Sequence, residues 1–447
     1  MPEQTVKIAR EFDYDVVVCG GGTAGFCAAV AAGRAGAKTA VIERFGVFGG
    51  TMTVGGVNAP ALFHAHGKRI IGGIGWELME DLHKRGYATM PPLDQGLRHP
   101  QMSVEINAFE AEVAIDRMVK DAGVDIFFHQ TVVYCNSGNG HVSSVLINSS
   151  EGLIRINGKV FIDCTGDGNV AVMAGADYEI SDELQPGSLN SIFMNWGKAA
   201  DDPEKTVEKF LKDVESGVLD PHDVWGLYVD ALVSGHGRGR GEPAWKNYTI
   251  NVGNNLNHVY PFNGADSRSR TEGEIEGRKS IARIVHWLNE NVQGFENTYI
   301  ASVSPVVSAR ESRRIMGNAY ITGEEYVRGY CPEDSVCYSF YPIDVHRGSE
   351  DAPLDNEYQD EGKVPGIPFG ALTAKGFDNL MMAGRIISGD RRAQSAFRVQ
   401  ATCMATGEAA GTAAAMSVKT GVSVDKLDIN ELREVLKENG MIVPGLE

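Results

Sequence analysis

A chain of 447 residues is long enough for two or three domains with large buried cores. Its formal net charge of −18 is spread along the chain without a basic block, which argues against nucleic acid or an anionic membrane surface as a partner. No apolar stretch approaches the roughly 18 uncharged residues of a transmembrane helix. Residues 1–13 lack the apolar core of a signal peptide. We therefore expect a cytoplasmic protein that does not span a membrane.

The seven cysteines contain no Cys-x-x-Cys pair, and several of them fall in apolar segments. Small, buried thiols are the ordinary interpretation of cysteines in such segments. The sequence predicts reduced cysteines and no metal site.

The first predicted elements form a βαβ unit, with a strand at 14–19, a glycine-rich turn at 20–25, a helix ending at Arg34 and a second strand at 38–43. In the turn, Gly20 can adopt a positive φ, Gly22 lets backbone amides approach a pyrophosphate, and Gly25 lets helix and strand pack closely. The pyrophosphate of an adenine dinucleotide would then lie at the positive end of the helix dipole.

Glu43 ends the second strand. A carboxylate at this place can hydrogen-bond both ribose hydroxyls of a dinucleotide, and its charge would repel the 2′-phosphate of NADP. The ligand expected from this unit is therefore FAD or NAD. A second glycine cluster at 49–51 would let the backbone pass close to the pyrophosphate and ribityl chain, although an ordinary glycine-rich loop would explain the cluster as well.

Further helices are predicted at 75–85, 107–122 and 169–174, and further strands at 124–128, 131–135, 141–148 and 153–161. The last three strands form a β-meander, because turns rich in Asn and Gly separate them. On the helix 107–122 we expect an apolar stripe made of Phe109, Val113, Ile115 and Met118.

Residues 180–368 change in character, with irregularly alternating aromatic and polar residues and short helices, which is typical of an inserted domain. A continuation of the first domain is the alternative. A strand at 379–385 and a helix of small residues at 400–418 then close the chain. Gly407 and Gly411 on that helix predict the close approach of another backbone.

Together these segments resemble the FAD-dependent oxidoreductases of the glutathione-reductase-like superfamily, in the branch that contains the fumarate reductase and succinate dehydrogenase flavoprotein subunits. The resemblance is strongest to the bacterial FAD dependent oxidoreductase family. The matching stretches are 16–43, 49–51, 63–74, 160–175, 310–317, 341–346 and 379–414.

The resemblance implies an α/β fold with a Rossmann-like FAD-binding domain, which contains a parallel sheet and a three-stranded β-meander. This domain would be discontinuous, at 1–180 and 366–447, and residues 181–365 would form an inserted α+β substrate or cap domain.

The resemblance also implies which residues hold FAD. Gly20, Gly22 and Gly25 would bind the pyrophosphate, Glu43 the adenosine ribose, and Arg44 would lie beside the adenine end. The other positions expected to contact FAD are Thr23, Ala24, Gly49, Gly50, Thr51, Val132, Thr165, Gly166, Asp167, Gly384, Arg385, Arg398 and Gln400.

One position departs from the family pattern. Fumarate reductases carry Ala-Gly-Glu where this chain has Ala383-Gly384-Arg385, so we expect Asp390 to supply the acid that binds the ribityl chain. The helix that starts near Gln400 would direct its N-terminus at the flavin and stabilise negative charge on the reduced ring. A tightly packed helix without that role explains its small residues equally well.

A flavoprotein disulfide reductase would need a second dinucleotide fingerprint and a redox-active cysteine pair. Gly166-Asp167-Gly168 follows a predicted strand, but no acid ends a clear following strand, and no cysteine pair is present. We therefore expect one tightly bound FAD, a small-molecule substrate and an unidentified electron donor or acceptor. Assembly as a homo-oligomer stays an open alternative.

Histidines and arginines are the candidate catalytic residues. A neutral histidine can accept a proton while hydride leaves for the flavin, and the family match favours His64 and His346 over His66. Arginines bind carboxylates through two-point contacts. Late arginines of the chain are Arg310, Arg313, Arg314, Arg385, Arg391, Arg392 and Arg398. We expect Arg313 and Arg391 in the substrate pocket and most of the others in FAD contacts or surface ion pairs.

Three functions are consistent with these features. The first is an FAD-dependent dehydrogenase that transfers a hydride between flavin N5 and the CH–OH or CH–CH group of a small polar molecule, such as a sugar derivative or a hydroxy acid. The second is a fumarate-reductase-like reductase of an activated alkene. The third is a flavin-binding subunit without catalytic activity.

Overall fold

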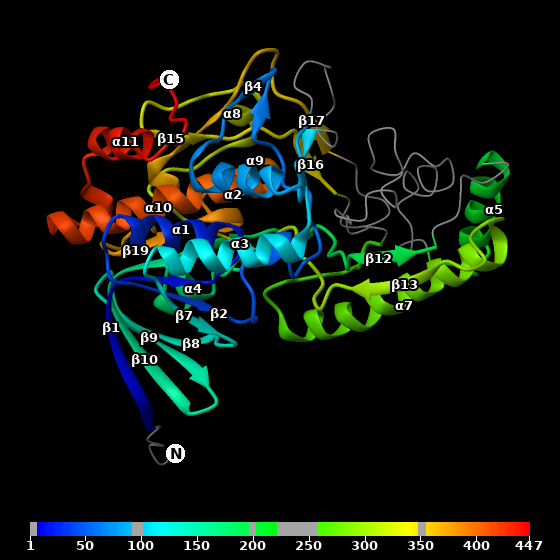
Figure 1. Ribbon diagram of the computed structural model, residues 1–447, viewed down its shortest axis with the longest axis horizontal. Helices are drawn as coiled ribbons and strands as arrows, with labels where there is room; N and C mark the ends of the chain where they lie inside the picture. The colour runs from blue at the N-terminus through cyan, green and yellow to red at the C-terminus, as the bar shows by residue number, and fades with distance from the viewer. Residues whose placement is uncertain (1–6, 92–101, 196–202, 221–256, 347–354) are drawn as a thin grey trace.

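A computed structural model describes residues 7–91, 102–195, 203–220, 257–346 and 355–447 (Figure 1). Its central sheet has the strand order β7-β2-β1-β10-β9-β8, with β19 paired to β10. The strands of this sheet are β1 (Ile8–Cys19), β2 (Thr39–Glu43), β7 (Asp125–Phe128), β8 (Val132–Gly138), β9 (His141–Ser149), β10 (Gly152–Asp163) and β19 (Leu380–Met382).

The sheet has a parallel part and an antiparallel part, and β10 belongs to both. Strand β10 runs parallel to β1 along most of its length and parallel to β19 at 161–163, while 152–157 pair with β9 in antiparallel fashion. Strand β8 continues this antiparallel meander. The predicted α/β fold, with a parallel sheet and a three-stranded meander, is confirmed.

Helices α1 (Thr23–Arg34), α2 (Gly73–Lys84), α3 (Ala108–Asp121) and α10 (Gln400–Thr420) lie together above one face of the sheet in Figure 1. Helix α10 touches the backbone of α1 at two glycines of α10. A Cβ added at Gly407 would lie 2.1 Å from the Ala24 carbonyl oxygen, and one at Gly411 would lie 2.2 Å from the Ala28 carbonyl oxygen. The predicted close approach of a second backbone at these glycines is confirmed.

The predicted apolar stripe on α3 is wrong in part. Phe109 and Val113 are 67% and 45% exposed, whereas Ile115 and Met118 are buried. The buried face also contains Ala111, Ala114 and Val119. Small alanines, rather than the large residues of the first turns, bring this helix close to its neighbours.

The remaining elements are short or lie in the second half of the chain. The helices are α4 (Asn169–Ala174), α5 (Pro203–Glu215), α7 (Ser267–Asn291), α8 (Gly323–Val327), α9 (Arg391–Phe397) and α11 (Ile429–Glu438). The paired strands are β3 (His64–Ala65) with β4 (Lys68–Arg69), β5 (Ala88–Thr89) with β6 (Glu105–Ile106), β11 (Tyr178–Ile180) with β14 (Arg313–Ile315), β12 (Ser191–Met194) with β13 (Tyr299–Val303), β15 (Ser335–Tyr338) with β18 (Gly366–Pro368), and β16 (Ile343–Val345) with β17 (Asp355–Glu357).

The buried apolar residues form two clusters. The larger cluster surrounds the central sheet, and the smaller one consists of residues between Leu189 and Val307, including Phe262, Ile281 and Trp287 of the α7 region. Elements α5, α7, β12 and β13 project to one side of the molecule in Figure 1. Buried residues of 315–367 belong to the larger cluster. We therefore propose that the inserted unit is narrower than 181–365 and spans about 187–309; we call it the smaller unit, and the rest of the described chain the larger unit.

Candidate functional site

A cavity of about 1320 Å³, which includes its opening to solvent, lies along the dinucleotide fingerprint and extends to the smaller unit. Its wall contains many of the residues that the sequence predicts as cofactor contacts. They are Gly20, Gly22, Thr23, Ala24, Glu43, Arg44, Gly50, Thr51, Val132, Thr165, Gly166, Gly384, Arg385, Arg398 and Gln400. Segments far apart in the sequence thus meet at one cavity.

The fingerprint turn is shaped by glycines that other residues could not replace. Gly20 has a φ of +102°, and a Cβ on it would lie 2.4 Å from the Cys164 carbonyl oxygen. A Cβ on Gly25 would lie 1.8 Å from the Gly20 carbonyl oxygen. Gly25 therefore lets α1 begin directly against the turn, behind the cavity wall.

The second glycine cluster packs onto this turn. The Thr23 hydroxyl donates to the Gly49 carbonyl over 3.1 Å, and the Gly49 amide donates to the Gly21 carbonyl over 3.0 Å. A Cβ on Gly50 would lie 2.9 Å from the Gly22 Cα. Because Gly22 and Gly50 both face the cavity without side chains, the backbone itself forms this wall.

Glu43 is 5% exposed at the end of β2. Its Oε2 accepts a hydrogen bond from the Gly21 amide over 2.7 Å, and its Oε1 accepts one from the Phe45 amide over 2.9 Å. Burial raises the pKa of this carboxyl, against the effect of the two amides. Each carboxylate oxygen has a further lone pair, so the residue can still accept from hydroxyls in the cavity.

Residues next to Glu43 also line the cavity. Arg44, Gln130, Thr131 and Val132 line it. Burial and the nearby positive charge of Arg270 lower the pKa of the Arg44 guanidinium. Val132 was predicted beside adenine, while Gln130 and Thr131 were not singled out by the sequence.

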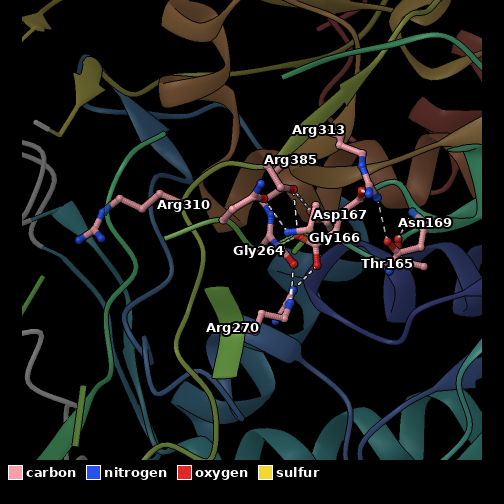
Figure 2. A network of polar contacts seen from close by, with 12 residues as sticks. Thr165, Gly166, Asp167, Asn169, Gly264, Arg270, Arg310, Arg313 and Arg385 are labelled. Atoms are coloured by element: carbon pink, nitrogen blue, oxygen red, sulfur yellow. Dashed lines mark hydrogen bonds and ion pairs between the residues drawn. The ribbon is translucent and has the colours of Figure 1, made fainter. Parts of the chain in front are cut away.

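A network of ion pairs centred on Asp167 lies behind this wall (Figure 2). Asp167 is 1% exposed. Its Oδ1 accepts from Arg385 over 2.9 Å and from the Ser312 hydroxyl over 2.8 Å, and its Oδ2 accepts from Arg270. Burial alone would raise the pKa of Asp167, but Arg385 and Arg270 outweigh it and the pKa lies below its ordinary value. Asp167 thus holds two arginines that line the cavity.

The last part of the wall comes from the C-terminal segment. Gly384 has a φ of +82°, and its amide donates to the Thr406 hydroxyl over 3.1 Å. Gln400 begins α10 and donates to the Val57 carbonyl over 2.7 Å. Its buried Oε1 has no hydrogen-bond partner among the described residues, and the same holds for the Nε atoms of Arg385 and Arg398.

These features fit a dinucleotide cofactor. Two glycines form a wall that a Cβ would fill, and polar atoms without protein partners belong to residues of the same wall. A flavin has carbonyl oxygens and ring nitrogens that such atoms can contact.

Asp390 does not belong to this wall. It is the N-cap of α9, where Oδ1 accepts from the Ala393 amide over 2.8 Å and Oδ2 accepts from the Gly323 amide over 2.7 Å. Binding of the ribityl chain by Asp390 stays a prediction; the structure gives this residue a capping role, since capping favours a short side chain that accepts hydrogen bonds at this place.

A second polar cluster lies at the other end of the cavity. Arg310 and Arg398 line the cavity there, and the Arg310 guanidinium lies 3.2 Å from the His258 Nε2. The rings of His258 and His346 are 5.1 Å apart, and the His346 Nε2 lies 3.2 Å from the Asp344 Oδ2. The Arg398 guanidinium is 3.6 Å from the same carboxylate oxygen.

Burial and the positive charge of Arg310 lower the pKa of His346 to about 4, although Asp344 opposes the shift. His346 is therefore neutral near pH 7. For Asp344, burial raises the pKa, but His346 and the two arginines outweigh it and the pKa lies well below its ordinary value. The cluster combines a charged carboxylate, two guanidinium groups and a neutral imidazole.

Three other candidate catalytic residues lie elsewhere. His64 is 3% exposed, lies edge-on against Trp76 with ring centroids 5.1 Å apart, and has a pKa lowered to about 4 by burial and Arg69. Arg313 donates to the Asp167 carbonyl and to Asn169 over 3.2 and 3.1 Å. Neither residue lines the cavity.

Arg391, the third of these candidates, lies 3.3 Å from the buried carboxylate of Glu311 and is also absent from the cavity wall. Substrate binding by Arg313 and Arg391 stays a prediction; in the structure both guanidinium groups make contacts that hold segments of the chain together. Arg310 and Arg398 face the cavity instead.

Sequence reasoning missed Arg270 and His258 as site residues, and it did not choose Arg310. Arg270 and His258 lie in the segment without clear strand or helix signals that was expected to be inserted. The sequence shows Arg270 two residues after Arg268, at the start of α7. Charge alone does not distinguish such an arginine from one on the protein surface.

Two further observations concern the described residues only. No helix among them is both long and apolar enough to cross a bilayer. No group of three or more His, Cys, Asp or Glu side chains in those parts of the chain could hold a metal ion.

Comparisons with known proteins identify the family of the chain. A family model described as FAD dependent oxidoreductase matches residues 15–436. A dihydrolipoyl dehydrogenase from Trypanosoma brucei brucei is 51% identical over 53 residues, which cover 12% of this chain and 11% of that enzyme. The chain therefore aligns with only a small part of that relative.

Two solved structures are similar to most of the chain at low sequence identity. A geranylgeranyl bacteriochlorophyll reductase-like protein from Thermoplasma acidophilum is 12% identical, with 96% of this chain and 84% of that chain covered and a TM-score of 0.44. A p-nitrophenol 4-monooxygenase from Pseudomonas putida is 13% identical, with 96% and 86% covered and a TM-score of 0.45. Since the family model spans most of the chain, the protein belongs to the FAD-dependent oxidoreductase family and its cofactor is FAD.

Proposed function

We propose that this protein oxidises a small polar substrate, at a CH–OH or CH–CH group, by transferring a hydride to FAD. The observation that carries the proposal is the polar cluster at the end of the cavity remote from Glu43. There, Arg310 and Arg398 line the same cavity as the dinucleotide fingerprint, and His346 and Asp344 lie directly behind them.

The residues of the fingerprint side would bind the adenosine and diphosphate parts of FAD. Glu43 is suited to the ribose, because a buried carboxylate accepts strongly from hydroxyl groups. Gly22 and Gly50 let the diphosphate lie against the backbone at the start of α1, where the helix dipole favours negative charge. When bound, FAD supplies the two-electron acceptor for the reaction.

Arg398 would bind and orient the polar or carboxylate part of the substrate, because a guanidinium group makes paired hydrogen bonds to such oxygens. Arg310 donates to the Pro186 carbonyl over 2.7 Å and to the Ser188 hydroxyl over 2.9 Å, so its part would be to add positive charge beside the substrate. His346 lies behind this wall and does not line the cavity, so it would accept the proton that leaves the substrate through one bridging water. Its ring is neutral near pH 7 and is held by Asp344, and a base that is oriented by a carboxylate is typical of proton-transfer sites.

The N-terminus of α10 supports the reduction of FAD in this reaction. Its first residue, Gln400, lines the cavity, and the helix runs on for 21 residues to Thr420. The positive end of a helix dipole stabilises negative charge placed against it. This arrangement favours a cofactor that becomes more negative when it is reduced.

The test is anaerobic reduction of the purified yellow protein. Hydroxy acids, polyols and sugar derivatives are mixed with the oxidised enzyme, and the loss of flavin absorbance is followed with time. We expect bleaching by at least one class of donor, slowed at least tenfold in Arg398→Gln. The exposed Arg328→Gln, on a side chain that is 69% exposed, is the matched control.

Two outcomes would replace the proposal. If no donor bleaches the flavin but an enoate rapidly reoxidises the photoreduced enzyme, the protein works in the direction of a fumarate-reductase-like enzyme. A protein that binds FAD and responds to neither kind of compound would be a flavin-binding subunit without this activity.

A further inference from the structure

Arg270 reaches the cavity from the smaller unit. It lies in the first turn of α7, whose later turns contribute Ile281 and Trp287 to the smaller apolar cluster. Its guanidinium donates to the Asp167 carboxylate of the larger unit and to the Gly264 carbonyl (Figure 2). Arg270 also lines the cavity. One side chain therefore joins α7, the turn after β10 and the cofactor site.

The contact is tightly fitted. A Cβ on Gly264 would lie 2.9 Å from the Ala309 Cβ and 3.1 Å from the Asp167 Oδ1. On the other side of Asp167, the Ser312 hydroxyl donates to the same Oδ1 over 2.8 Å. The smaller unit thus meets the larger one at this point through a partly buried ion pair, in which the Asp167 carboxylate is buried and the Arg270 side chain is 25% exposed.

The positive charge around Asp167 is larger than the negative charge that the protein places beside it. Asp167 is one carboxylate shared by two arginines, Arg270 and Arg385, and Arg44 adds a third guanidinium close enough for Arg270 to lower its pKa. Among the described residues of the cavity wall, Glu43 is the only acid. An anion in the cavity would therefore be favoured beside these three arginines.

The fingerprint turn is next to this arginine group. A Cβ on Gly20 would contact the backbone of Cys164 and Thr165, at 2.4 and 2.9 Å, and a Cβ on Gly166 would lie 3.0 Å from a terminal guanidinium nitrogen of Arg385. The backbone amides at the start of α1 and the arginines thus face a common part of the cavity. The diphosphate is the part of FAD that carries full negative charge.

We propose that Arg270 binds the diphosphate of FAD from the smaller unit, so that cofactor binding fastens the smaller unit to the larger one. The proposal rests on the placement of FAD in this cavity. Asp167 has a positioning role in it, because it orients the guanidinium groups of Arg270 and Arg385 before the cofactor arrives. A diphosphate between the three arginines would neutralise the excess positive charge.

The experiment uses the full-length apoprotein and two fragments of the cofactor. ADP has a diphosphate and adenosine has none, so their affinities separate the diphosphate contact from the adenosine contact. In Arg270→Gln we expect ADP affinity to fall about tenfold or more, with adenosine affinity unchanged. Arg278→Gln changes the same charge on the same helix, at a side chain that is 58% exposed, and should leave both affinities as they are.

A second readout tests the fastening of the two units. Saturating ADP should protect the smaller unit of the wild-type apoprotein from limited trypsin digestion, and this protection should be lost in Arg270→Gln but kept in Arg278→Gln. Arg270→Lys keeps the charge and loses the two-point contact, so an intermediate loss of ADP affinity is expected. If Arg270→Gln does not fold, the ADP affinity of Arg270→Lys tests the inference in its place.

The outcomes separate this inference from the placement of FAD. Glu43→Gln should weaken ADP and adenosine alike; if it weakens neither, FAD does not lie in the cavity as proposed. If Glu43→Gln weakens both and the Arg270 variants bind ADP like the wild type, Arg270 has only a structural role and the inference is wrong. An equal loss of ADP and adenosine affinity in Arg270→Gln leads to the same conclusion.

Discussion

Gly407 on α10 lies against the carbonyl of Ala24 on α1, and a Cβ on this glycine would be 2.1 Å from that oxygen. Ala24 lines the cavity, and a Cβ on Gly384 would come within 3.2 Å of the Ala24 Cβ. Residues 24 and 407 are 383 positions apart (407 − 24), so the packing of two helices far apart in the sequence determines the shape of the cofactor wall.

Gly407→Ala tests this relationship. A methyl group cannot fit against backbone at this distance, so the helices must move apart, and we expect a loss of about 1–3 kcal/mol in the free energy of unfolding together with weaker FAD retention. Denaturant unfolding and FAD titration measure the two effects. Gly138→Ala is the control, because a Cβ there meets no atom within 4 Å. Wild-type stability in Gly407→Ala would show that α1 and α10 can separate without cost.

Glu43→Gln should raise the dissociation constant of FAD about tenfold, since a hydrogen bond to a charged group is worth roughly 1.5–3 kcal/mol. Glu43 has hydrogen bonds to the Gly21 and Phe45 amides, and an amide side chain can accept at only one of its two terminal atoms. Fluorescence titration of the apoprotein measures the change. Glu324→Gln, at a side chain that is 71% exposed, should bind FAD normally. Equal affinity in both variants would remove Glu43 from the cofactor site.

Glu408 predicts a pH dependence of stability. It is 1% exposed on α10 and accepts from the Ile74 amide at the start of α2 over 2.7 Å. Burial raises its pKa from 4.5 to about 8. Between these values the unfolded chain has lost the proton that the native protein keeps, so the free energy of unfolding falls as the pH rises through this window.

Glu408→Gln should remove that part of the pH dependence, because the amide resembles the protonated carboxyl and still accepts from the Ile74 amide. We expect the variant to become more stable than the wild type as the pH is raised towards 8, by an amount on the order of a few kcal/mol. Denaturant unfolding at several pH values measures it. Glu431→Gln, in the exposed first turn of α11, is the control. Parallel pH profiles for Glu408→Gln and the wild type would contradict the prediction.

Asp344→Asn should slow flavin reduction by substrate about tenfold or more and leave FAD affinity unchanged, since Asp344 orients His346 and does not line the cavity. His346 with a pKa of about 4 accepts a proton only when neutral, so the wild-type rate should rise with pH and level off above that value. Loss of Asp344 removes an interaction that raises this pKa, which should move the midpoint lower.

Stopped-flow reduction over a range of pH measures the effect of Asp344→Asn. Asp355→Asn, on an ion pair with Arg392, is the control for the loss of a carboxylate in the same region. Loss of FAD affinity together with an unchanged reduction rate would assign Asp344 to cofactor binding.

Short-range patterns were predicted well from the sequence. The fingerprint turn needs glycines for steric reasons that act within a few residues, and the meander follows from turn residues between apolar runs. The stripe on α3 was mistaken because its four residues do not share one face: at about 100° per residue, Phe109 and Val113 lie on the side of the helix opposite to Ile115 and Met118. The sequence did not show that Asp390 caps a helix, because a cap and a ligand contact use the same kind of side chain.

The sequence by itself indicated the cradle at the start of α1, because its glycines lie close together in the chain, and it indicated the family and FAD through motifs spread over 16–414. Only the tertiary structure decided which arginines face the cavity. Arg270 and Asp167 are 103 positions apart, and nothing local distinguishes Arg270 from a surface arginine on a charged helix. Arg313 and Arg391 instead hold the chain together. Contacts between residues far apart in the chain decide whether a guanidinium group faces the cavity. The residues next to each arginine in the sequence do not decide it.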